Sequence, residues 1–326
     1  MRSVCALTLL TVISIVSPEW ANAQKVYRIG ALVADDQFVL AVDGFKKRMV
    51  QMGYVEGKNV SYNFQNSKGD QVALKKMAEM LIQEKPDLIV TSSTTATVTM
   101  AKLTAGSNFP VVFLSAGDPL RVVKSYASSG NNLTGISTSS LDLIDKRMEL
   151  LKNIAPKTKR VIVLVDTVGI GINHERFVSD ARDAAKRLNM DPVELKIQAR
   201  NAEEVKQKIP LIKRSLGDAL FVPPDATVVA TTEAIAQQVI KERLPHIGPN
   251  VETVKRGLLA AYSSNYFSLG EQGAVLVDKV LKGARPTDLP TEQPFKLHLM
   301  LNLKTAKAIG IEIPSDILLQ ADEVFR

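Results

Sequence analysis

Residues 53–60 read GYVEGKNV, and the elements on either side of this stretch decide the fold. An apolar, β-branched run at 26–33 precedes it and predicts a strand, and a run of helical length at 38–52 leads directly into it. A second predicted strand follows and ends at the polar turn NSKGD, residues 66–70. The sequence therefore opens with strand, helix, turn and strand, which is the order of an α/β unit.

The same alternation of strands and helices continues along most of the chain. Further apolar, β-branched runs lie at 87–90, 111–114, 160–165, 219–222 and 258–261. Continuous apolar strands are typical of a parallel sheet that is covered on both faces. Amphipathic helix candidates lie at 71–84, 95–105, 140–153, 175–189, 201–214, 226–242 and 266–282. The repeated order predicts an α/β fold built from doubly wound parallel sheets.

The length predicts two lobes, because 326 residues exceed what a single hydrophobic core usually supports. Small and polar residues cluster at 129–132, 262–265 and 285–290, where we expect the chain to cross between lobes in a multi-strand hinge. The expected bounds are 24–136 with about 263–290 for lobe 1, and 137–262 with about 291–326 for lobe 2.

The first 23 residues have the pattern of a secretory signal peptide. Arg2 gives a positive start, an apolar run follows at 4–16, and Ala21-Asn22-Ala23 is a small-x-small cleavage pattern. The apolar run is too short for a stable transmembrane helix, although an uncleaved anchor is the alternative. We expect cleavage after Ala23 and a periplasmic location. Cleavage would remove the only cysteine, so the mature chain would form no disulfide.

Charge and motifs argue against several functional classes. The net charge of +7 is spread along the chain, which favours a solvated surface over nucleic-acid binding. The three histidines are far apart in sequence, and no Walker A loop or GxSxG motif occurs. Gly169-Ile170-Gly171 lacks the third glycine of a dinucleotide fingerprint, and the adjacent Asp35 and Asp36 are poorly placed to act together on one substrate. The sequence predicts no enzyme, cofactor or metal site.

A run of hydroxyl side chains follows the third predicted strand. Residues 91–97 read TSSTTAT and carry six hydroxyl groups, which is more than a helix cap requires. Ligands of open α/β sheets bind beyond the carboxyl ends of the strands. Hydroxyls and the backbone N–H groups of a helix N-terminus together suit a carboxylate. We therefore expect Ser93, Thr94 and Thr95 to bind an anionic or carbonyl group, with helix capping as the alternative role.

Other strand ends supply the remaining candidates for ligand binding. They are Gln37, Ser115 and Asp118 in lobe 1, Asp166 and Asp225 in lobe 2, and Asn265 and Tyr266 near the hinge. Asp118 and Asp225 each precede a predicted helix, so capping is an equal alternative for both. Tyr266 is a candidate wall for an apolar or aromatic ligand, with core packing as its alternative.

Several motifs resemble one family when they are taken in order. They are GYVEGKNV (53–60), KPDLIVT (85–91) before Thr94-Thr95-Ala96, PVVF (110–113) before Asp118-Pro119, GNNLTG (130–135), KGARP (282–286) and NLKTAK (302–307). Their order and spacing resemble the substrate-binding proteins of ABC transporters with the periplasmic-binding-protein type 1 fold, in the branch that includes tryptophan- and tyrosine-type binders. The resemblance covers essentially the whole mature chain.

The resemblance implies a monomeric, extracytoplasmic receptor that captures a small organic ligand, such as an amino acid or an aromatic compound, for an ABC importer. Its permease and ATPase partners would be separate chains. One departure concerns the ligand: many members have an aspartate in the loop after the late strand, where this chain has Asn265, a neutral hydrogen-bonding partner. A ligand-sensing partner of a membrane receptor and a periplasmic enzyme are the alternative functions.

Overall fold

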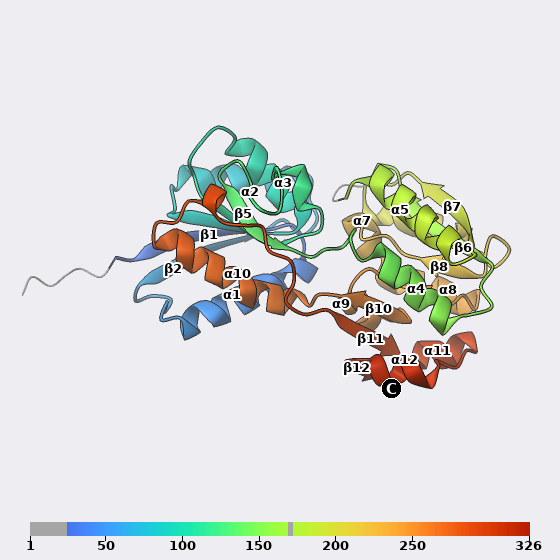
Figure 1. The fold of residues 1–326 in the computed structure, drawn as a ribbon. Helices are drawn as coiled ribbons and strands as arrows, with labels where there is room; N and C mark the ends of the chain where they lie inside the picture. The colour runs from blue at the N-terminus through green and yellow to red at the C-terminus, as the bar shows by residue number, and fades with distance from the viewer. Residues whose placement is uncertain (1–24, 169–171) are drawn as a thin grey trace, which may run out of the picture.

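The computed structural model describes residues 25–168 and 172–326, which form two α/β lobes lying side by side (Figure 1). The expected signal peptide and the Gly169-Ile170-Gly171 stretch lie outside the described residues. Lobe 1 is built on a parallel sheet with strand order β2-β1-β3-β4-β5. Its strands are β1 (Tyr27–Val33), β2 (Val60–Asn66), β3 (Leu88–Ser92), β4 (Val111–Ala116) and β5 (Leu133–Ser137).

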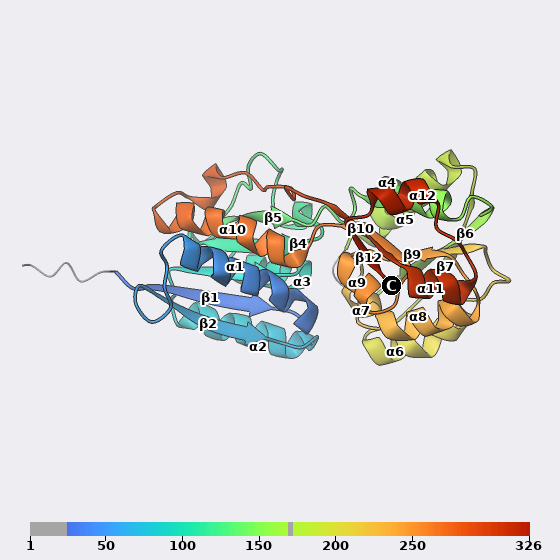
Figure 2. The same ribbon diagram turned by 90° about the horizontal axis from the view of Figure 1, so that it is seen from below.

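Helices cover both faces of the lobe 1 sheet, as the continuous apolar strands predict. The helices are α1 (Val39–Gln51), α2 (Gln71–Gln83), α3 (Thr94–Leu103) and α10 (Tyr266–Leu281), with short 3-10 helices η1 (Asp36–Phe38), η2 (Pro119–Arg121) and η4 (Pro286–Asp288). Figures 1 and 2 show α1 and α10 side by side on one face and α2 and α3 on the other. Helix α10 thus returns from late in the sequence to complete the lobe that the N-terminal part begins.

The GYVEGKNV stretch forms the tight connection between α1 and β2. Gly53 has a φ of 91°, a left-handed conformation that glycine adopts without steric cost. The side chain of Asn59 closes the turn, because it accepts from the Val55 N–H at 2.7 Å and donates to the Gly53 carbonyl at 2.9 Å. Tyr54 donates to the Asp278 carboxylate on α10 at 2.8 Å. The turn therefore also fixes the position of α10 against the sheet.

Lobe 2 has a second parallel sheet and a smaller mixed sheet. The parallel sheet has the order β7-β6-β8-β9, and the mixed sheet has the order β10-β11-β12 with β10 antiparallel to β11. The strands are β6 (Arg160–Asp166), β7 (Asp191–Ile197), β8 (Ala219–Phe221), β9 (His246–Ile247), β10 (Ala260–Ser263), β11 (His298–Asn302) and β12 (Glu323–Phe325). A bridge between Gly248 and Ala261 links the two sheets.

Helices cover both faces of the parallel sheet of lobe 2, and strand β6 is buried on both sides. The helices are α4 (Ile144–Ile154), α5 (His174–Arg187), α6 (Ala202–Lys208), η3 (Ile209–Leu211), α7 (Ala226–Val229), α8 (Thr232–Lys241), α9 (Val251–Lys255), α11 (Leu303–Ile309) and α12 (Ser315–Gln320). Val161 and Val163 belong to the core cluster under α4 and α5, whereas Ile162 and Leu164 belong to the cluster under α6 and α8. The period of two along an all-apolar strand thus supplies two cores at once.

Two predicted helices differ from the structure. The helix expected at 201–214 ends as α6 and continues only as η3, because Pro210 lacks the N–H that an α-helix requires there. The helix expected at 226–242 is divided into α7 and α8, and the hydroxyl of Thr231 at the break donates to the Val228 carbonyl at 2.8 Å. Local backbone chemistry, which the hydrophobic period does not reveal, causes both differences.

The chain crosses between the lobes after β5, between β10 and α10, and between η4 and β11 (Figures 1 and 2). The first and third crossovers are tied together, because Ser137 N–H donates to the Glu292 carbonyl at 2.8 Å and Glu292 N–H donates to the Gly135 carbonyl at 2.9 Å. The residue bounds expected for the two lobes remain a prediction.

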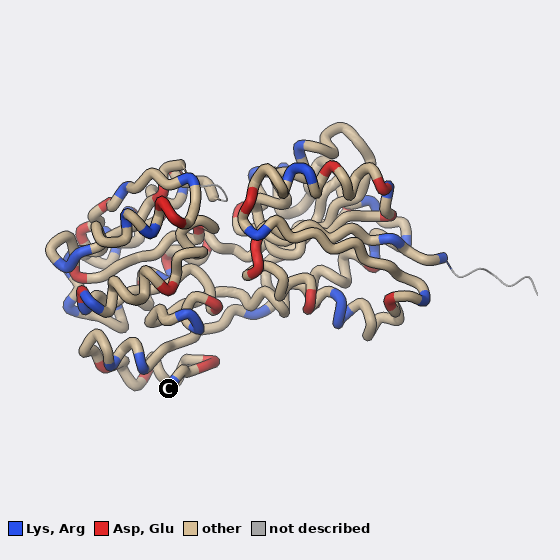
Figure 3. Tube along the Cα trace, turned by 180° about the vertical axis from the view of Figure 1, so that it is seen from behind, with Lys and Arg blue, Asp and Glu red and all other residues tan. Residues whose placement is uncertain are grey.

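The surface and the helices bear on partner classes. Figure 3 shows Lys and Arg interspersed with Asp and Glu over both lobes. Among the helices in residues 25–168 and 172–326, none combines the length and apolar character that crossing a bilayer requires.

Candidate ligand-binding site between the lobes

A small cavity of about 40 Å³ lies where the two lobes meet, at the carboxyl ends of β3 and β4. It is lined by Gln37, Phe38, Ser93, Thr94, Thr95, Ser115 and Gly117 of lobe 1, by Thr138 and Ser140 of the first crossover, by Pro224, Ala226, Val229, Pro249 and Asn250 of lobe 2, and by Tyr266. A second cavity of about 430 Å³ shares Phe38, Thr95 and Ala226 with the first. The two adjacent cavities together reach the size of a small-molecule pocket, about 300–1,000 Å³.

Six of the residues predicted from the sequence meet in the smaller cavity. They are Gln37, Ser93, Thr94, Thr95, Ser115 and Tyr266. Asp118, Asp166, Asp225 and Asn265 do not line it. Thr138, Ser140 and Asn250 also line the cavity and were not predicted from the sequence. The hydroxyl-rich stretch STSS at 137–140 follows β5 and carries the same signal as the run after β3, so the first two could have been found.

The N-terminus of α3 presents hydroxyl groups as donors. Ser93 caps the helix by accepting from the Ala96 N–H at 3.1 Å, and it does so from a positive φ of 104°, which is rare for a residue with a side chain. Thr94 accepts from the Gly117 N–H at 2.8 Å. In both residues the hydroxyl oxygen is thus used as an acceptor, which leaves the hydroxyl hydrogen available to a ligand. These groups suit a carboxylate or a carbonyl oxygen.

Ser115 has the opposite polarity. The Ser92 hydroxyl lies 2.9 Å from both the Phe38 carbonyl and the Ser115 hydroxyl. Because Ser92 has one hydrogen and donates it to the carbonyl, Ser115 must donate to Ser92. Ser115 therefore offers its lone pairs to the cavity. Gln37 adds a second acceptor, since its buried Oε1 has no hydrogen-bond partner among the described residues. The cavity thus presents donors from α3 and neutral acceptors nearby.

Aromatic rings form one wall of the cavity. The rings of Phe38 and Tyr266 meet edge to face with centroids 5.3 Å apart, an arrangement that aromatic pairs favour. The Tyr266 hydroxyl lies 3.4 Å from the amide nitrogen of Asn250, which also lines the cavity. Burial raises the pKa of Tyr266, so its hydroxyl stays protonated. The wall offers apolar contact to a planar ligand, with polar groups at its edge.

The acidic candidates of lobe 2 instead bind backbone groups. Asp166 accepts from the Ala199 N–H at 3.1 Å and from the Val168 N–H at 3.3 Å. Asp225 caps α7 by accepting from the Thr227 N–H at 2.9 Å and the Val228 N–H at 3.1 Å. Its other carboxylate oxygen lies 3.4 Å from Nε2 of His174, so Asp225 caps α7 and also contacts a side chain of α5.

Asn265 and Asp118 have other surroundings. Asn265 caps α10, where it accepts from the Ser268 N–H at 3.2 Å, and it borders a separate depression on the hinge side. Asp118 is 5% exposed and lies at the interface between the lobes, facing the start of α5. Neither side chain is placed to contact a ligand in the cavity.

Two buried ionisable groups lie next to the cavity residues. Arg147 on α4 is 1% exposed and donates to the carbonyls of Ser140 and Tyr262, both at 2.9 Å, and burial lowers its pKa to about 10. Arg147 thereby fixes the first crossover, which carries Ser140, against β10. Burial raises the pKa of Glu252 on α9 to about 7. No sequence pattern indicated either residue, because their burial depends on how the lobes and crossovers pack.

The described residues hold no group of three or more His, Cys, Asp or Glu side chains that could bind a metal ion.

Both the fold and the sequence define the class of this protein. Parallel sheets flanked by helices in two lobes match the type 1 periplasmic binding proteins, as predicted. The sequence pattern of the ABC transporter substrate binding protein family matches residues 27–325, and the chain belongs to that family. It is 30% identical over 294 residues to a "Tyrosine-binding protein" of Clostridioides difficile strain R20291, covering 90% of this chain and 83% of that protein.

Two solved structures differ in how closely they match. One is an ABC domain from Streptococcus pneumoniae in complex with L-Trp, with 25% identity, a TM-score of 0.83, and coverage of 92% of this chain and 100% of that one. The other is a ligand-free, open structure of a substrate binding protein with adhesive properties from Clostridium difficile, with 26% identity, a TM-score of 0.69, and coverage of 92% and 99%. Since identity and coverage are nearly equal, the backbone arrangement here is closer to that of the L-Trp complex.

Proposed function

We propose that this protein is the solute-binding receptor of an ABC importer and that it captures a small organic ligand in the cavity between the lobes. The single observation that carries the proposal is the set of donor hydroxyls at the start of α3, Ser93 and Thr94, facing the aromatic wall of Phe38 and Tyr266. The receptor would be a periplasmic monomer after removal of residues 1–23. It would deliver ligand to separate permease and ATPase chains and would have no catalytic activity.

The ligand class follows from the groups around the cavity. The α3 hydroxyls would bind a carboxylate or carbonyl, and the aromatic wall would take a planar, apolar group. An N–H or ammonium group would meet the neutral acceptors of Gln37 and Ser115. The relatives are a tyrosine-binding protein and a structure in complex with L-Trp, so aromatic amino acids are the first ligands to test. Their deaminated analogues are matched ligands that reveal whether the ammonium group contributes to affinity.

Capture would proceed by closure of the two lobes. Lobe 1 supplies the hydroxyl donors and most of the aromatic wall, and lobe 2 adds Asn250 and the apolar residues Ala226 and Val229. A ligand held first by lobe 1 gains the lobe 2 contacts only when the lobes close. Differential binding of this kind shifts the population towards the closed state.

We expect Thr94→Ala to weaken ligand affinity at least about tenfold without unfolding the protein. The substitution removes a hydroxyl that donates to the ligand and also supports the Gly117 N–H. Thr94→Ser is the matched control, because it keeps the hydroxyl and should stay within about threefold of wild type. Isothermal titration calorimetry with the aromatic amino acids and their analogues measures both variants.

Wild-type affinity in Thr94→Ala would place the site elsewhere on the molecule. Recovery of a chemically altered ligand after incubation would instead support a periplasmic enzyme. A receptor that signals to a membrane partner would share the binding result, and only uptake of labelled ligand in cells would separate it from a transport receptor.

A further inference from the structure

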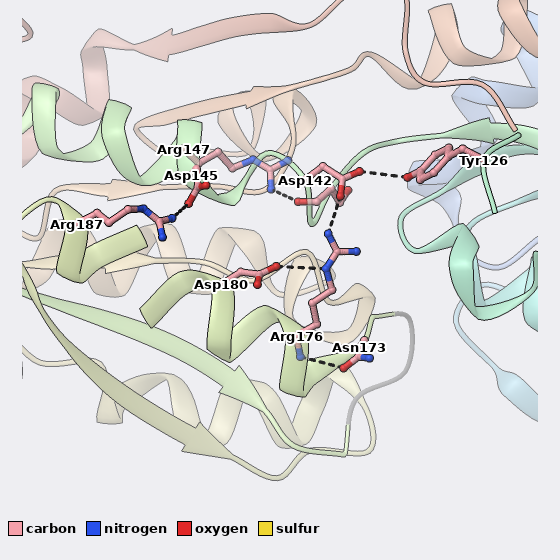
Figure 4. Close-up of polar contacts among 9 residues, drawn as sticks. Tyr126, Asp142, Asp145, Arg147, Asn173, Arg176, Asp180 and Arg187 are labelled. Atoms are coloured by element: carbon pink, nitrogen blue, oxygen red, sulfur yellow. Dashed lines mark hydrogen bonds and ion pairs between the residues drawn. The ribbon is translucent and has the colours of Figure 1, made fainter. Parts of the chain in front are cut away.

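A polar network outside the cavity joins the two lobes (Figure 4). The Tyr126 hydroxyl, on the loop before β5 in lobe 1, lies 3.1 Å from one carboxylate oxygen of Asp142, at the end of the first crossover. The other oxygen of Asp142 accepts from Arg176 on α5 of lobe 2 at 2.6 Å. Arg176 also contacts Asp180 on the same helix at 3.3 Å. The carboxylate of Asp142 therefore connects a lobe 1 side chain to a lobe 2 helix.

Asp118 is a second buried acidic residue at the same place. It follows β4 in lobe 1, and it faces the N-terminus of α5, a helix of 14 residues in lobe 2. Burial raises the pKa of Asp118, while the guanidinium groups of Arg121 and Arg176 and the backbone N–H of Asn173 oppose that rise. A carboxylate at a helix N-terminus is also favoured by the helix dipole. Arg176 thus lies near two acidic groups that come from different parts of the fold.

Each side of this network is anchored within its own lobe. The Tyr126 carbonyl accepts from the Thr291 N–H at 2.8 Å, which holds the loop to the lobe 1 side of the third crossover. Asn173 caps α5 by accepting from the Arg176 N–H at 3.0 Å, which fixes the helix start in lobe 2. Opening of the lobes would therefore break the contacts that join the two lobes, because each partner stays with its own lobe. None of these residues lines the cavity.

We propose that Asp118 and Tyr126 of lobe 1, with Asp142 and Arg176 of lobe 2, form a closure latch that slows ligand release without touching the ligand. The proposal rests on the proposed function of ligand capture. The latch adds stability only to the closed state, so its loss raises the dissociation rate of the ligand. These four residues act on binding by stabilising the closed arrangement of the lobes. Asp118, which the sequence predicted to contact the ligand, is one of them.

The test compares single latch variants with a control variant on α5, the lobe 2 helix that carries Arg176. Tyr126→Phe removes only the hydroxyl, and Asp118→Asn removes only the charge. Arg182→Gln breaks the Arg182–Glu194 ion pair, which also involves α5 but lies entirely within lobe 2. We expect each latch variant to raise the ligand dissociation rate about three- to tenfold, which is the effect of losing one intramolecular hydrogen bond of ordinary strength. Arg182→Gln should match wild type, and the melting temperature should hardly change.

Lobe separation provides a second measurement that needs no ligand. A chain beginning at Gln24 contains no cysteine, so spin labels can be placed at Lys76→Cys on α2 and Lys208→Cys on α6, both exposed. Double electron–electron resonance measures the distance between the two labels, and a short distance indicates closed lobes. We expect both latch variants to reduce the population of molecules with the short distance.

The outcomes separate the latch from the proposed function. Unchanged distances and unchanged dissociation rates in both latch variants would overturn the latch while leaving the receptor intact. A wild-type protein that binds none of the aromatic ligands would contradict the proposed ligand class, and the ligand-free distances would then decide on the latch. Additive effects of Tyr126→Phe and Asp142→Ala would also overturn it, because the two partners of one contact must be coupled.

Discussion

Gly270→Val is expected to lower the free energy of unfolding by about 3 kcal/mol or more, which is a large fraction of the roughly 5–15 kcal/mol that stabilises an ordinary protein. A Cβ atom at Gly270 on α10 would lie 1.8 Å from the Ala41 carbonyl oxygen and 2.8 Å from the Phe45 nitrogen on α1. Both atoms belong to backbone, which cannot rotate aside as a side chain can. Gly44 makes the reciprocal contact, with a Cβ 1.9 Å from the Phe267 carbonyl oxygen.

Urea unfolding followed by circular dichroism measures this effect. Ser268→Ala is the matched control, because it adds no bulk and lies on the exposed side of the same helix. Its free energy of unfolding should stay within about 0.5 kcal/mol of wild type. A Gly270→Val protein as stable as the control would show that α1 and α10 do not pack as closely as described here.

Because of His246, the free energy of unfolding is expected to fall by about 3 kcal/mol as the pH falls from 6.5 to 4. Its side chain is fully buried between β8 and β10, where it contacts the Leu244 carbonyl at 2.7 Å and accepts from the Leu259 N–H at 2.8 Å. Burial lowers the pKa of His246 to about 4. The unfolded chain binds a proton near pH 6.5 and the folded chain does not, so stability is lost as the pH falls through this window.

Glu252 acts in the opposite direction, and the experiment must separate the two. Burial raises the pKa of Glu252 to about 7, so the folded state keeps a proton that the unfolded state releases from about pH 4.5 upward. Its effect costs stability as the pH rises. The comparison is therefore between wild type and His246→Gln, measured by urea unfolding at each pH. The difference in stability should shrink as the pH falls below 6.5, and a difference that is constant with pH would contradict the buried, neutral histidine.

The sheets could be predicted from the sequence because local patterns determine them. Apolar runs such as 161–165 are buried on both faces, and their composition alone indicates it. The order of strands and helices then allows few topologies. The cavity residues after β3 and β4 were predictable for a related reason, since ligands bind at the carboxyl ends of parallel strands and Ser93, Thr94 and Ser115 follow such ends.

The rest of the site depends on facts that no local pattern contains. Whether Asp225 points at a ligand or back to its own helix is decided by one side-chain torsion, and both outcomes fit the same sequence. Ser140 and Asn250 reach the cavity only because the crossovers bring lobe 2 against lobe 1. Arg147 is buried because two carbonyls from distant segments converge on it. Such contacts arise from the relative placement of the lobes.

Small-angle X-ray scattering of the chain beginning at Gln24 tests directly whether the two lobes close around a ligand. The measurement compares the ligand-free protein with the protein saturated by the aromatic ligand that calorimetry selects. We expect the radius of gyration to fall on binding and the scattering curve of the complex to match the arrangement of lobes in Figure 1. An identical curve with and without a ligand that binds stoichiometrically would contradict capture by lobe closure.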